Sequence, residues 1–487
     1  MENRNDIIRA YLESNPLSQQ QIDSYNRFVG STIHKIVESM SVIEPNIKGY
    51  SIKLSGLRFA PPMVVESDGT SKRIMPHEAV ARNLNYSALI YATYTPMISG
   101  IPKLDDVKET VIGELPVMAR SSLCYTRNMT KSQLIQEHED PYDPGGYFII
   151  KGTERVLVGI EDIAPNRMIN ATDKKGSAVT SVTSTTLSFR AKCSVTRDKY
   201  GMYTVLFPTI TKGVGIILLL RALGMDTADI IKHISNNDAK NDMLLNIESS
   251  DERDIPNKDI LVHLGRISAP NQAPTYQIKR AESQLDMYIL PHLGVSKDDR
   301  AAKAEYLIKM AERSSLQAYG YIRKDDKDSY ANKRVKLAGD LLEELFTSAF
   351  KALVKDISYR VERSNARGRR MTMHTNINPD TLKDRILYAM GTGSWPTGQT
   401  GVSEVLDRSN FSSSLAHIRR VKSTLAKKHP NYPARDVHGT TIGKICPTET
   451  PEGTAVGLTK YLALMAKVTI GADESQIVES IKKLDVM

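Results

Sequence analysis

The sequence predicts an α+β protein made of several domains. Segments with the three- and four-residue spacing of helices alternate with short segments rich in β-branched residues, and no regular strand–helix–strand order links them. A chain of 487 residues is long enough for about three domains of ~150 residues each. No apolar run reaches the ~18 residues of a membrane-spanning helix, so we expect no membrane span.

The helices are predicted from apolar periodicity. Residues 20–40 place apolar side chains on one helical face, and residues 305–318 show the same spacing. The strongest pattern runs from Leu337 to Val361 and predicts a long helix packed on an apolar core. Gly339, near the start of this helix, is expected to cost about 1 kcal/mol relative to alanine.

The strands are predicted where β-branched and tyrosine residues gather, as in residues 50–60 and 87–98. The segments on either side of residues 197–201 predict a hairpin around a turn. Gly145 and Gly146 predict a tight turn with positive φ rather than a nucleotide-binding loop, because the spacing of the common phosphate-cradling motifs is absent.

Two polar stretches are predicted to lie outside the regular elements. The Ser/Thr-rich interval from Ser177 to Ser188 marks a change from one structural unit to the next. The polar and acidic residues 236–257 predict an exposed excursion.

The positive charge of the chain is concentrated near its C-terminal end. The net charge is +9, and the segment from Glu404 to Lys467 contains ten Lys and Arg residues against five acids. A basic excess of this kind fits an anionic partner such as nucleic acid, although many soluble proteins reach it without one.

The cysteines predict neither a disulfide framework nor a zinc site. Cys124, Cys193 and Cys446 are far apart and form no CxxC pair. We therefore expect reduced thiols, a cytoplasmic protein and no zinc in this chain, with Cys446 as a small buried apolar residue.

The chain is organised around residues 435–464, which combine charges with many turn formers between two apolar segments. This combination predicts a rigid loop on a scaffold, the usual setting of a functional site. Glu449 and Glu452 are the only close acid pair of the region, and we expect them to pair with nearby arginines rather than to hold a metal ion. His417 and His438 are expected to be hydrogen-bonded structural residues.

The basic residues of this region have two interpretations. Arg419, Arg420, Lys422 and Arg435 could form a solvated face, which is the common case for a charge run. Because they are interleaved with turn residues and joined to an apolar scaffold, we favour contact with phosphates, without base readout.

Several long motifs carry a resemblance to a known family. They are residues 143–158, 215–224, 326–342, 401–421 and 435–466. Together, and in this order, they resemble the second-largest (β-like) subunit of archaeal and eukaryotic multisubunit DNA-dependent RNA polymerases. The sequence is similar to the N-terminal half of that subunit, which some archaea encode as two proteins, and its polar end favours a natural split over a truncation.

The resemblance implies a domain organisation. Residues 1–172 and 334–390 would form the protrusion, residues 173–333 an inserted lobe, and residues 391–487 the fork. The fork would border the active centre at the downstream edge of the transcription bubble.

The resemblance also implies site residues. Those facing nucleic acid or the incoming nucleotide would be Arg419, Arg420, Lys422, Arg435, Lys444 and Glu452. A pocket beside the RNA path would be formed by Gln399, Asp407 and His417. The sequence departs from the usual family pattern at Thr441, Ile442, Ala455 and Tyr461, so no role is carried over to these four positions.

The resemblance further implies the cofactor and the partners. The catalytic Mg²⁺ of the complex would be held by the largest subunit, so this chain would have no catalytic residue or metal of its own. The partners would be the C-terminal half of the second-largest subunit, the largest subunit, the DNA template, the RNA–DNA hybrid and nucleoside triphosphates.

Three functions are weighed. The first is a subunit of DNA-directed RNA polymerase, a nucleotidyltransferase, that helps to form the nucleic-acid cleft and is inactive alone. The alternative is a free-standing basic nucleic-acid-binding module. A self-contained nucleotidyltransferase is disfavoured because the sequence lacks clustered carboxylates.

Overall fold

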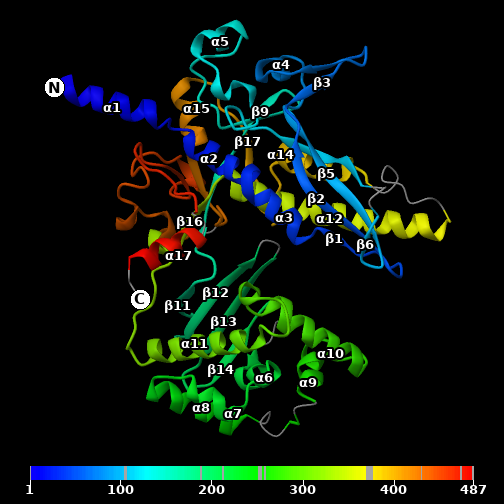
Figure 1. The fold of residues 1–487 in the computed structure, drawn as a ribbon. Helices are drawn as coiled ribbons and strands as arrows, with labels where there is room; N and C mark the ends of the chain where they lie inside the picture. Colours follow the sequence, from blue (N-terminus) through cyan, green and yellow to red (C-terminus); the bar gives the residue numbers. More distant parts are fainter. Residues whose placement is uncertain are drawn as a thin grey trace. The chain divides into compact units, whose positions relative to one another are not determined.

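The computed structural model describes residues 2–103, 107–186, 189–210, 213–250, 255–256, 259–368, 377–428, 430–471 and 474–484 (Figure 1). The chain divides into two compact units. Unit 1 comprises Met1–Asp162 and Val335–Met487, and unit 2 comprises Ile163–Arg334. Both units mix helices and strands, which confirms the prediction of a mixed fold with more than one domain.

Unit 1 contains most of the elements. Its helical segments are α1 (Glu2–Ser14), α2 (Gln19–Arg27), the π-helix η1 (Phe28–Thr32), α3 (Ile33–Ser39), α4 (Pro76–Ala81), η3 (Tyr125–Asn128), α5 (Lys131–Gln136), α12 (Ala338–Ala366), α14 (Asp380–Thr392), α15 (Phe411–Ile418), α16 (Tyr432–Arg435), η8 (Gly439–Thr441), η9 (Gly453–Ala455) and α17 (Glu474–Lys483). Its strands are β1 (Val42–Ile43), β2 (Tyr50–Phe59), β3 (Met63–Val65), β4 (Ser71–Arg73), β5 (Ser87–Ile98), β6 (Ile101–Pro102), β7 (Lys108–Pro116), β8 (Phe148–Ile150), β9 (Thr153–Leu157), β17 (Ser403–Val405), β18 (Arg420–Ser423) and β19 (Thr459–Tyr461). Strands β10 (Gly159–Ile163) and β16 (Lys333–Lys336) include the boundaries between the units.

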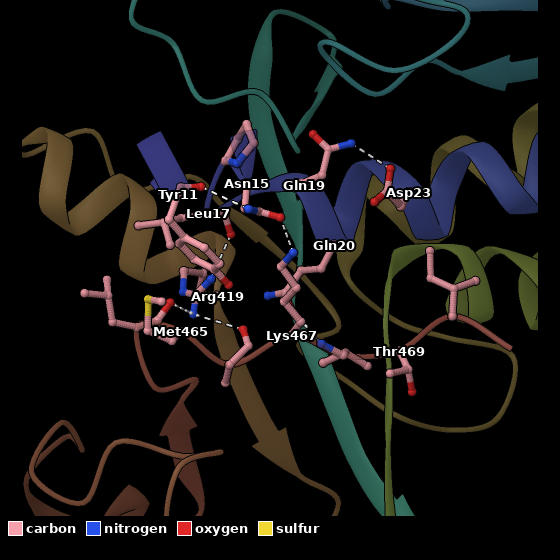
Figure 2. A pocket seen from close by; sticks show the side chains of 15 residues that line it. Tyr11, Asn15, Leu17, Gln19, Gln20, Asp23, Arg419, Met465, Lys467 and Thr469 are labelled. Carbon is pink, nitrogen blue, oxygen red and sulfur yellow. Dashed lines mark hydrogen bonds between the residues drawn. The ribbon is translucent and has the colours of Figure 1, made fainter. Parts of the chain in front are cut away.

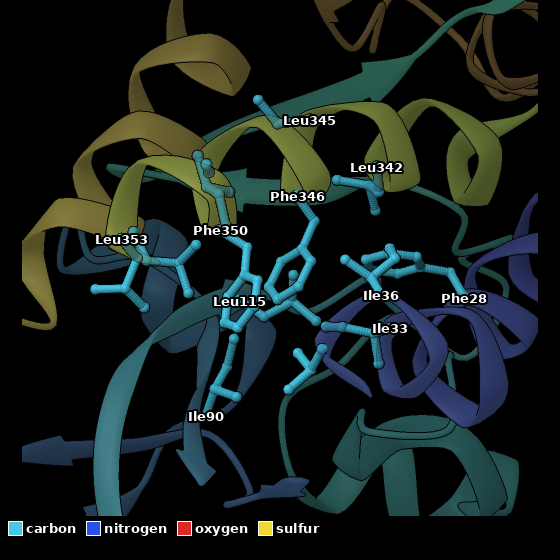
Figure 3. Close-up of a cluster of buried hydrophobic side chains, with 14 of the residues drawn as sticks. Phe28, Ile33, Ile36, Ile90, Leu115, Leu342, Leu345, Phe346, Phe350 and Leu353 are labelled. Atoms are coloured by element: carbon cyan, nitrogen blue, oxygen red, sulfur yellow. The ribbon is translucent and has the colours of Figure 1, made fainter. Parts of the chain in front are cut away.

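The core of unit 1 lies between a sheet and the helices that pack on it. The sheet has the order β1-β2-β5-β6, with β7 also paired to β5, and each of these pairings is antiparallel. Alternate residues of β5 are buried, as expected for a strand with one face on a core. Figure 3 shows Phe346 and Phe350 of α12 packed with Phe28 and Ile33 of the helical segment 19–39. The predicted helices at residues 20–40 and from Leu337 onward are thus confirmed.

Gly339 has a packing role that its sequence position does not predict. A Cβ atom at this residue would lie 2.1 Å from the backbone oxygen of Ser24 in α2. The amide of Gly339 donates to the Ser24 hydroxyl at 3.0 Å. Close approach of α12 to α2 therefore requires glycine here, and the cost in helix propensity is the smaller effect.

The other sheets of unit 1 carry the C-terminal region. Strands β16, β10, β18 and β19 form a four-stranded sheet in that order, with β10 parallel to β18 and β18 antiparallel to β19. Strands β17, β9 and β8 form a second small sheet. Gly145 and Gly146, just before β8, have φ of +65° and +83°, which confirms the predicted turn.

Unit 2 is an antiparallel sheet covered by helices. Its strands, in sheet order, are β11 (Met168–Thr172), β12 (Ala178–Thr186), β13 (Phe189–Arg197), β14 (Tyr203–Leu206) and β15 (Val214–Gly215). Its helical segments are α6 (Ile216–Ala222), α7 (Thr227–Lys232), α8 (Asn237–Ser249), α9 (Ile260–Ser268), α10 (Pro274–Ser283), η5 (Gln284–Tyr288), η6 (Pro291–Leu293), α11 (Arg300–Ala318) and η7 (Tyr330–Asn332). Helix α11 packs on β12 and β13. The hairpin predicted around residues 197–201 is confirmed as β13–β14.

Two predictions for unit 2 are wrong. The Ser/Thr-rich interval is strand β12 inside the unit, not a border, although residues 187 and 188 lie outside the described part of the chain. The polar stretch 236–257 is mostly helix α8, and its residues 251–254 and 257 are not among those described. Polar residues of α8 are buried because they bind the neighbouring turn: Asn246 accepts from the amide of Tyr203 at 2.8 Å and donates to the carbonyl of Gly201 at 2.7 Å.

Among the described residues, no helix combines the length and the apolar character needed to cross a membrane.

We predict that Gly339→Ala destabilises unit 1 by about 1–3 kcal/mol, because its methyl group must displace the Ser24 backbone. The matched control is Gly391→Ala in α14, where a Cβ meets nothing within 4 Å, and it is expected to be neutral or stabilising by up to ~1 kcal/mol. Denaturant unfolding can be followed by the fluorescence of Trp395, the single tryptophan, which is 3% exposed in unit 1. Equal stability of the two variants would contradict the packing role of Gly339.

Candidate nucleic-acid interface

Strand β18 places two predicted cations on one face. In this strand Val421 is buried, while Arg420 and Lys422 on either side of it keep 22% and 18% of their side chains exposed. This is the two-residue alternation of a strand with one face on a core. Arg420 and Lys422 therefore point the same way.

Glu404 of β17 is the counter-charge of this pair. Its carboxylate forms one ion pair with Lys422 and another with Arg420, the latter at 3.2 Å. The same carboxylate accepts a hydrogen bond from His417 Nε2 at 3.2 Å. Burial alone would raise the pKa of Glu404, but the hydrogen bonds from His417 and Lys422 and the charge of Lys422 lower it to about 2. One carboxylate thus joins β17, β18 and α15.

His417 is held in one tautomer by its two partners. Its Nδ1 accepts from the backbone amide of Asp407 at 3.1 Å, so the proton of the neutral ring lies on Nε2 and is donated to Glu404. The side chain is almost fully buried. The prediction of a hydrogen-bonded structural histidine is confirmed for His417.

Only two of the three predicted pocket residues meet. Asp407 and His417 are joined by the hydrogen bond from the Asp407 amide to the histidine ring. The Asp407 carboxylate also accepts hydrogen bonds from the amide and hydroxyl of Ser409, which lower its pKa. Gln399 lies in the turn that follows Trp395, with its carbonyl accepting from the Trp395 amide at 2.8 Å. In the described part of the chain, no hydrogen bond links Gln399 to Asp407 or His417.

Arg419 is not exposed to a nucleic-acid partner in this structure. It is 7% exposed, and its guanidinium donates to the carbonyls of Leu17, Ala463 and Leu464 at 2.9, 2.6 and 3.1 Å. These bonds give Arg419 a structural role, and its expected contact with nucleic acid remains a prediction. Burial lowers its pKa.

Arg435 is likewise turned toward its own backbone. Its guanidinium donates to the carbonyls of Thr454, Val456 and Lys427, each at 2.9 Å. Gly457 packs on it so closely that a Cβ there would lie 2.2 Å from the Arg435 carbonyl oxygen. Arg435 thus holds the loop before it and the loop after it together.

The remaining predicted residues lie on the surface. Lys444 and Glu452 are exposed, as are Lys427 and Lys428 of the loop held by Arg435. The expected ion pairs of Glu449 and Glu452 with arginines are not formed by any described residue, so that prediction is corrected. The guanidinium groups of Arg419 and Arg435 are bonded to carbonyl groups, and that of Arg420 is bonded to Glu404 and Tyr461.

The four positions that break the family pattern have different settings. Tyr461 accepts a hydrogen bond from Arg420 Nε at 3.1 Å, and the guanidinium lies over its ring at 5.4 Å. The Thr441 side chain is buried and donates to the carbonyl of His438, whereas Ile442 is 82% exposed. Ala455 is half-buried in η9. Tyr461 therefore positions Arg420.

Two acids that the sequence did not single out are important here. Glu404 organises β18, and Glu161 of β10 is 3% exposed and pairs with Lys460 at 3.0 Å. The alternation of Arg420 and Lys422 signals that a counter-charge is needed, but the acid that supplies it is evident only from the tertiary structure, because β17 and β18 belong to different sheets.

The titratable groups form no metal site in the described residues. Those residues contain no cluster of three or more His, Cys, Asp and Glu side chains that could hold a metal ion. The three cysteines are unpaired, and Cys446 is half-buried rather than buried as expected. Hydrogen bonds from the Thr448 hydroxyl and from backbone amides lower the pKa of its thiol.

We predict that Glu404→Gln lowers the stability of unit 1 by about 1–3 kcal/mol at pH 7, because Arg420 and Lys422 lose their common counter-charge. The folded carboxyl titrates near 2 and the unfolded one near 4.5. The stabilisation by the Glu404 carboxylate is therefore complete above about pH 5 and is lost as the pH falls toward 2. The difference in unfolding free energy between wild type and variant, called the gap below, thus narrows on acidification. Denaturant unfolding at several pH values, read by Trp395 fluorescence, measures the gap, with Glu449→Gln as the exposed control; a gap independent of pH would contradict the prediction.

Comparison with known proteins identifies the family of the chain. Residues 16–384 match the family model of the RNA polymerase beta subunit, and residues 404–468 match that of RNA polymerase Rpb2, domain 3. The DNA-directed RNA polymerase subunit Rpo2N of Methanocaldococcus jannaschii is 42% identical over 99% of this chain and 98% of its own length. Rpo2N of Methanococcus vannielii is 39% identical over 98% of both chains.

A longer relative shows how much of a one-piece subunit is matched. The DNA-directed RNA polymerase subunit Rpo2 of Saccharolobus shibatae is 41% identical over 99% of this chain, which spans only 43% of that relative. The match to Rpo2N, by contrast, is end to end. The chain belongs to the RNA polymerase beta subunit family, and it corresponds to the N-terminal half of the second-largest subunit, as the archaeal Rpo2N subunits do.

Proposed function

We propose that this chain, a subunit of a DNA-dependent RNA polymerase, forms part of the nucleic-acid cleft and one wall of the active centre. The observation that carries this proposal is the end-to-end match to Rpo2N of Methanocaldococcus jannaschii. The chain is not catalytic alone in this proposal. The catalytic Mg²⁺ is assigned to the largest subunit, since no described acidic cluster here has the composition of a two-metal site.

The domain names belong to the same proposal. The resemblance implies a protrusion of residues 1–172 and 334–390, a lobe of residues 173–333 and a fork of residues 391–487, and we adopt this division with one change, at the start of the lobe. The separate compactness of Ile163–Arg334 supports an inserted lobe. Because β11 pairs with β12 in the sheet of unit 2, we place the start of the lobe at Ile163.

We assign the phosphate contacts to exposed lysines rather than to the arginines. Lys427 and Lys428 lie on the loop that Arg435 holds, and Lys444 is exposed on a neighbouring loop. Arg420 and Lys422 retain one positive charge beyond Glu404, which leaves them suited to a nearby phosphate.

The partners in this proposal are those of a split second-largest subunit. They are the C-terminal half of that subunit, the largest subunit, the DNA template, the RNA–DNA hybrid and nucleoside triphosphates. Glu452, exposed at the start of η9, is assigned to the neighbourhood of the incoming nucleotide. The reaction class is templated ribonucleotide addition by the assembled enzyme.

We predict that the triple substitution of Lys427, Lys428 and Lys444 by alanine weakens binding of the assembled polymerase to a DNA bubble template. Each lost phosphate contact reduces the slope of log affinity against log salt by up to ~0.9, so a reduction of about 2–3 is expected. Fluorescence anisotropy at several salt concentrations measures this slope.

The control replaces Lys35, Lys48 and Lys53, which are exposed elsewhere in unit 1. This replacement removes the same amount of charge. It is expected to change the slope by less than one. Equal slopes for the two triple variants would contradict the assignment of phosphate contacts to the fork lysines.

A further inference from the structure

A cavity of about 300 Å³ lies beside the start of α2 in unit 1 (Figure 2). One wall comes from the N-terminal residues 11–23 and the other from residues 464–470, with Arg419 between them in the sequence. A volume of this size accommodates several side chains of a partner segment. Of the contacts described for the nucleic-acid interface, only the hydrogen bonds from Arg419 to carbonyl groups lie at this cavity.

One polar group of the cavity wall lacks a partner. Gln20 is 7% exposed, its Oε1 accepts from the Val468 amide at 3.3 Å, and its buried Nε2 donates to no group. The neighbouring polar groups are satisfied: Gln19 donates to Asp23 at 2.6 Å, and Lys467 bonds to Asn15. An unsatisfied buried donor costs about 1–3 kcal/mol, and the broad terminal torsion of glutamine lets it turn toward an acceptor in the cavity.

The rim of the cavity is apolar and exposed. Leu464 and Met465 line the cavity and are 59% and 53% exposed. Farther along the chain, helix α17 exposes Ile477, Val478 and Ile481 by 43–49%. Adjacent exposed apolar side chains of this kind are typical of surfaces that another polypeptide covers.

The relatives indicate which polypeptide this is. This chain corresponds to only 43% of the one-piece Rpo2 of Saccharolobus shibatae, and it matches the N-terminal half of the subunit. The match to Rpb2 domain 3 ends at residue 468, on the cavity wall. In the one-piece relative, the remaining part of the subunit belongs to the same polypeptide as the counterpart of this wall.

We propose that the cavity receives a segment of the polypeptide that supplies the remaining part of the second-largest subunit. Apolar side chains of this segment pack on Leu464 and Met465, and a carboxylate or carbonyl oxygen accepts from Gln20 Nε2. Lys467, exposed at the rim, favours an acidic residue as the source of that oxygen. The inference rests on the proposed function, because it takes its partner from there.

The test measures binding of the full 487-residue chain to the second-half polypeptide from the same organism, by calorimetry or light scattering. Met465→Arg places a charge on the apolar rim. Met63→Arg is the matched control, since Met63 is also in unit 1 and is 50% exposed. Gln20→Glu keeps the acceptor for Val468 but removes the donor, and Trp395 fluorescence checks that each variant remains folded.

We expect Met465→Arg and Gln20→Glu each to weaken binding about tenfold or more, and Met63→Arg to bind within about twofold of wild type. Binding of either cavity variant at wild-type strength would overturn the inference while leaving the subunit partnership intact. Failure of the wild-type chain to bind the second half would contradict the proposed partnership and the inference with it.

Discussion

Two buried or half-buried guanidinium groups, each bonded to three or more main-chain carbonyls, hold the C-terminal region of this chain in shape. Arg419 connects the segment before α2 to residues 463–466, and Arg435 connects the loops on either side of α16. Irregular loops leave carbonyls without the partners that helices and sheets provide. A charged group with five donors in a fixed plane satisfies several of these carbonyls at once.

The positively charged residues of this region therefore differ in their surroundings. Arg419 and Arg435 support the backbone, while Arg420 and Lys422 share the carboxylate of Glu404. The exposed lysines of the same loops are left for an anionic partner. A basic segment that looks uniform in sequence thus contains structural cations, balanced cations and available cations.

The sequence predicted the elements that depend on local pattern. The long helix from Leu337, the hairpin around residues 197–201 and the glycine turn before β8 were all expected and are present. It could not predict which way an arginine at the end of a short helix faces. Arg419 is oriented by two residues that are distant in the sequence, one of them 402 positions away and the other 44 positions away. Helix α8 was missed because its buried polar residues bind a turn that is distant in the sequence.

The family resemblance predicts the region and the residues of the site, and these remain predictions. Residue chemistry suggested arginines as phosphate ligands, whereas in the structure Arg419 and Arg435 bond to main-chain carbonyls and lysines of the same region are exposed. Tyr461 gained importance through the pairing of β18 with β19, and Glu404 through its contacts with β18 from another sheet. Such roles depend on tertiary contacts, which a single sequence does not specify.

The most direct measurement compares Arg435→Ala with wild type for both loop order and elongation. Amide hydrogen exchange of residues 424–428 and 454–457 is measured in the full chain, and elongation is measured in the assembled polymerase. If Arg435 acts through the loops, the variant loses amide protection in both segments and elongates more slowly. Slower elongation with unchanged amide protection would contradict this account, because it would mean that Arg435 contacts the nucleic acid itself.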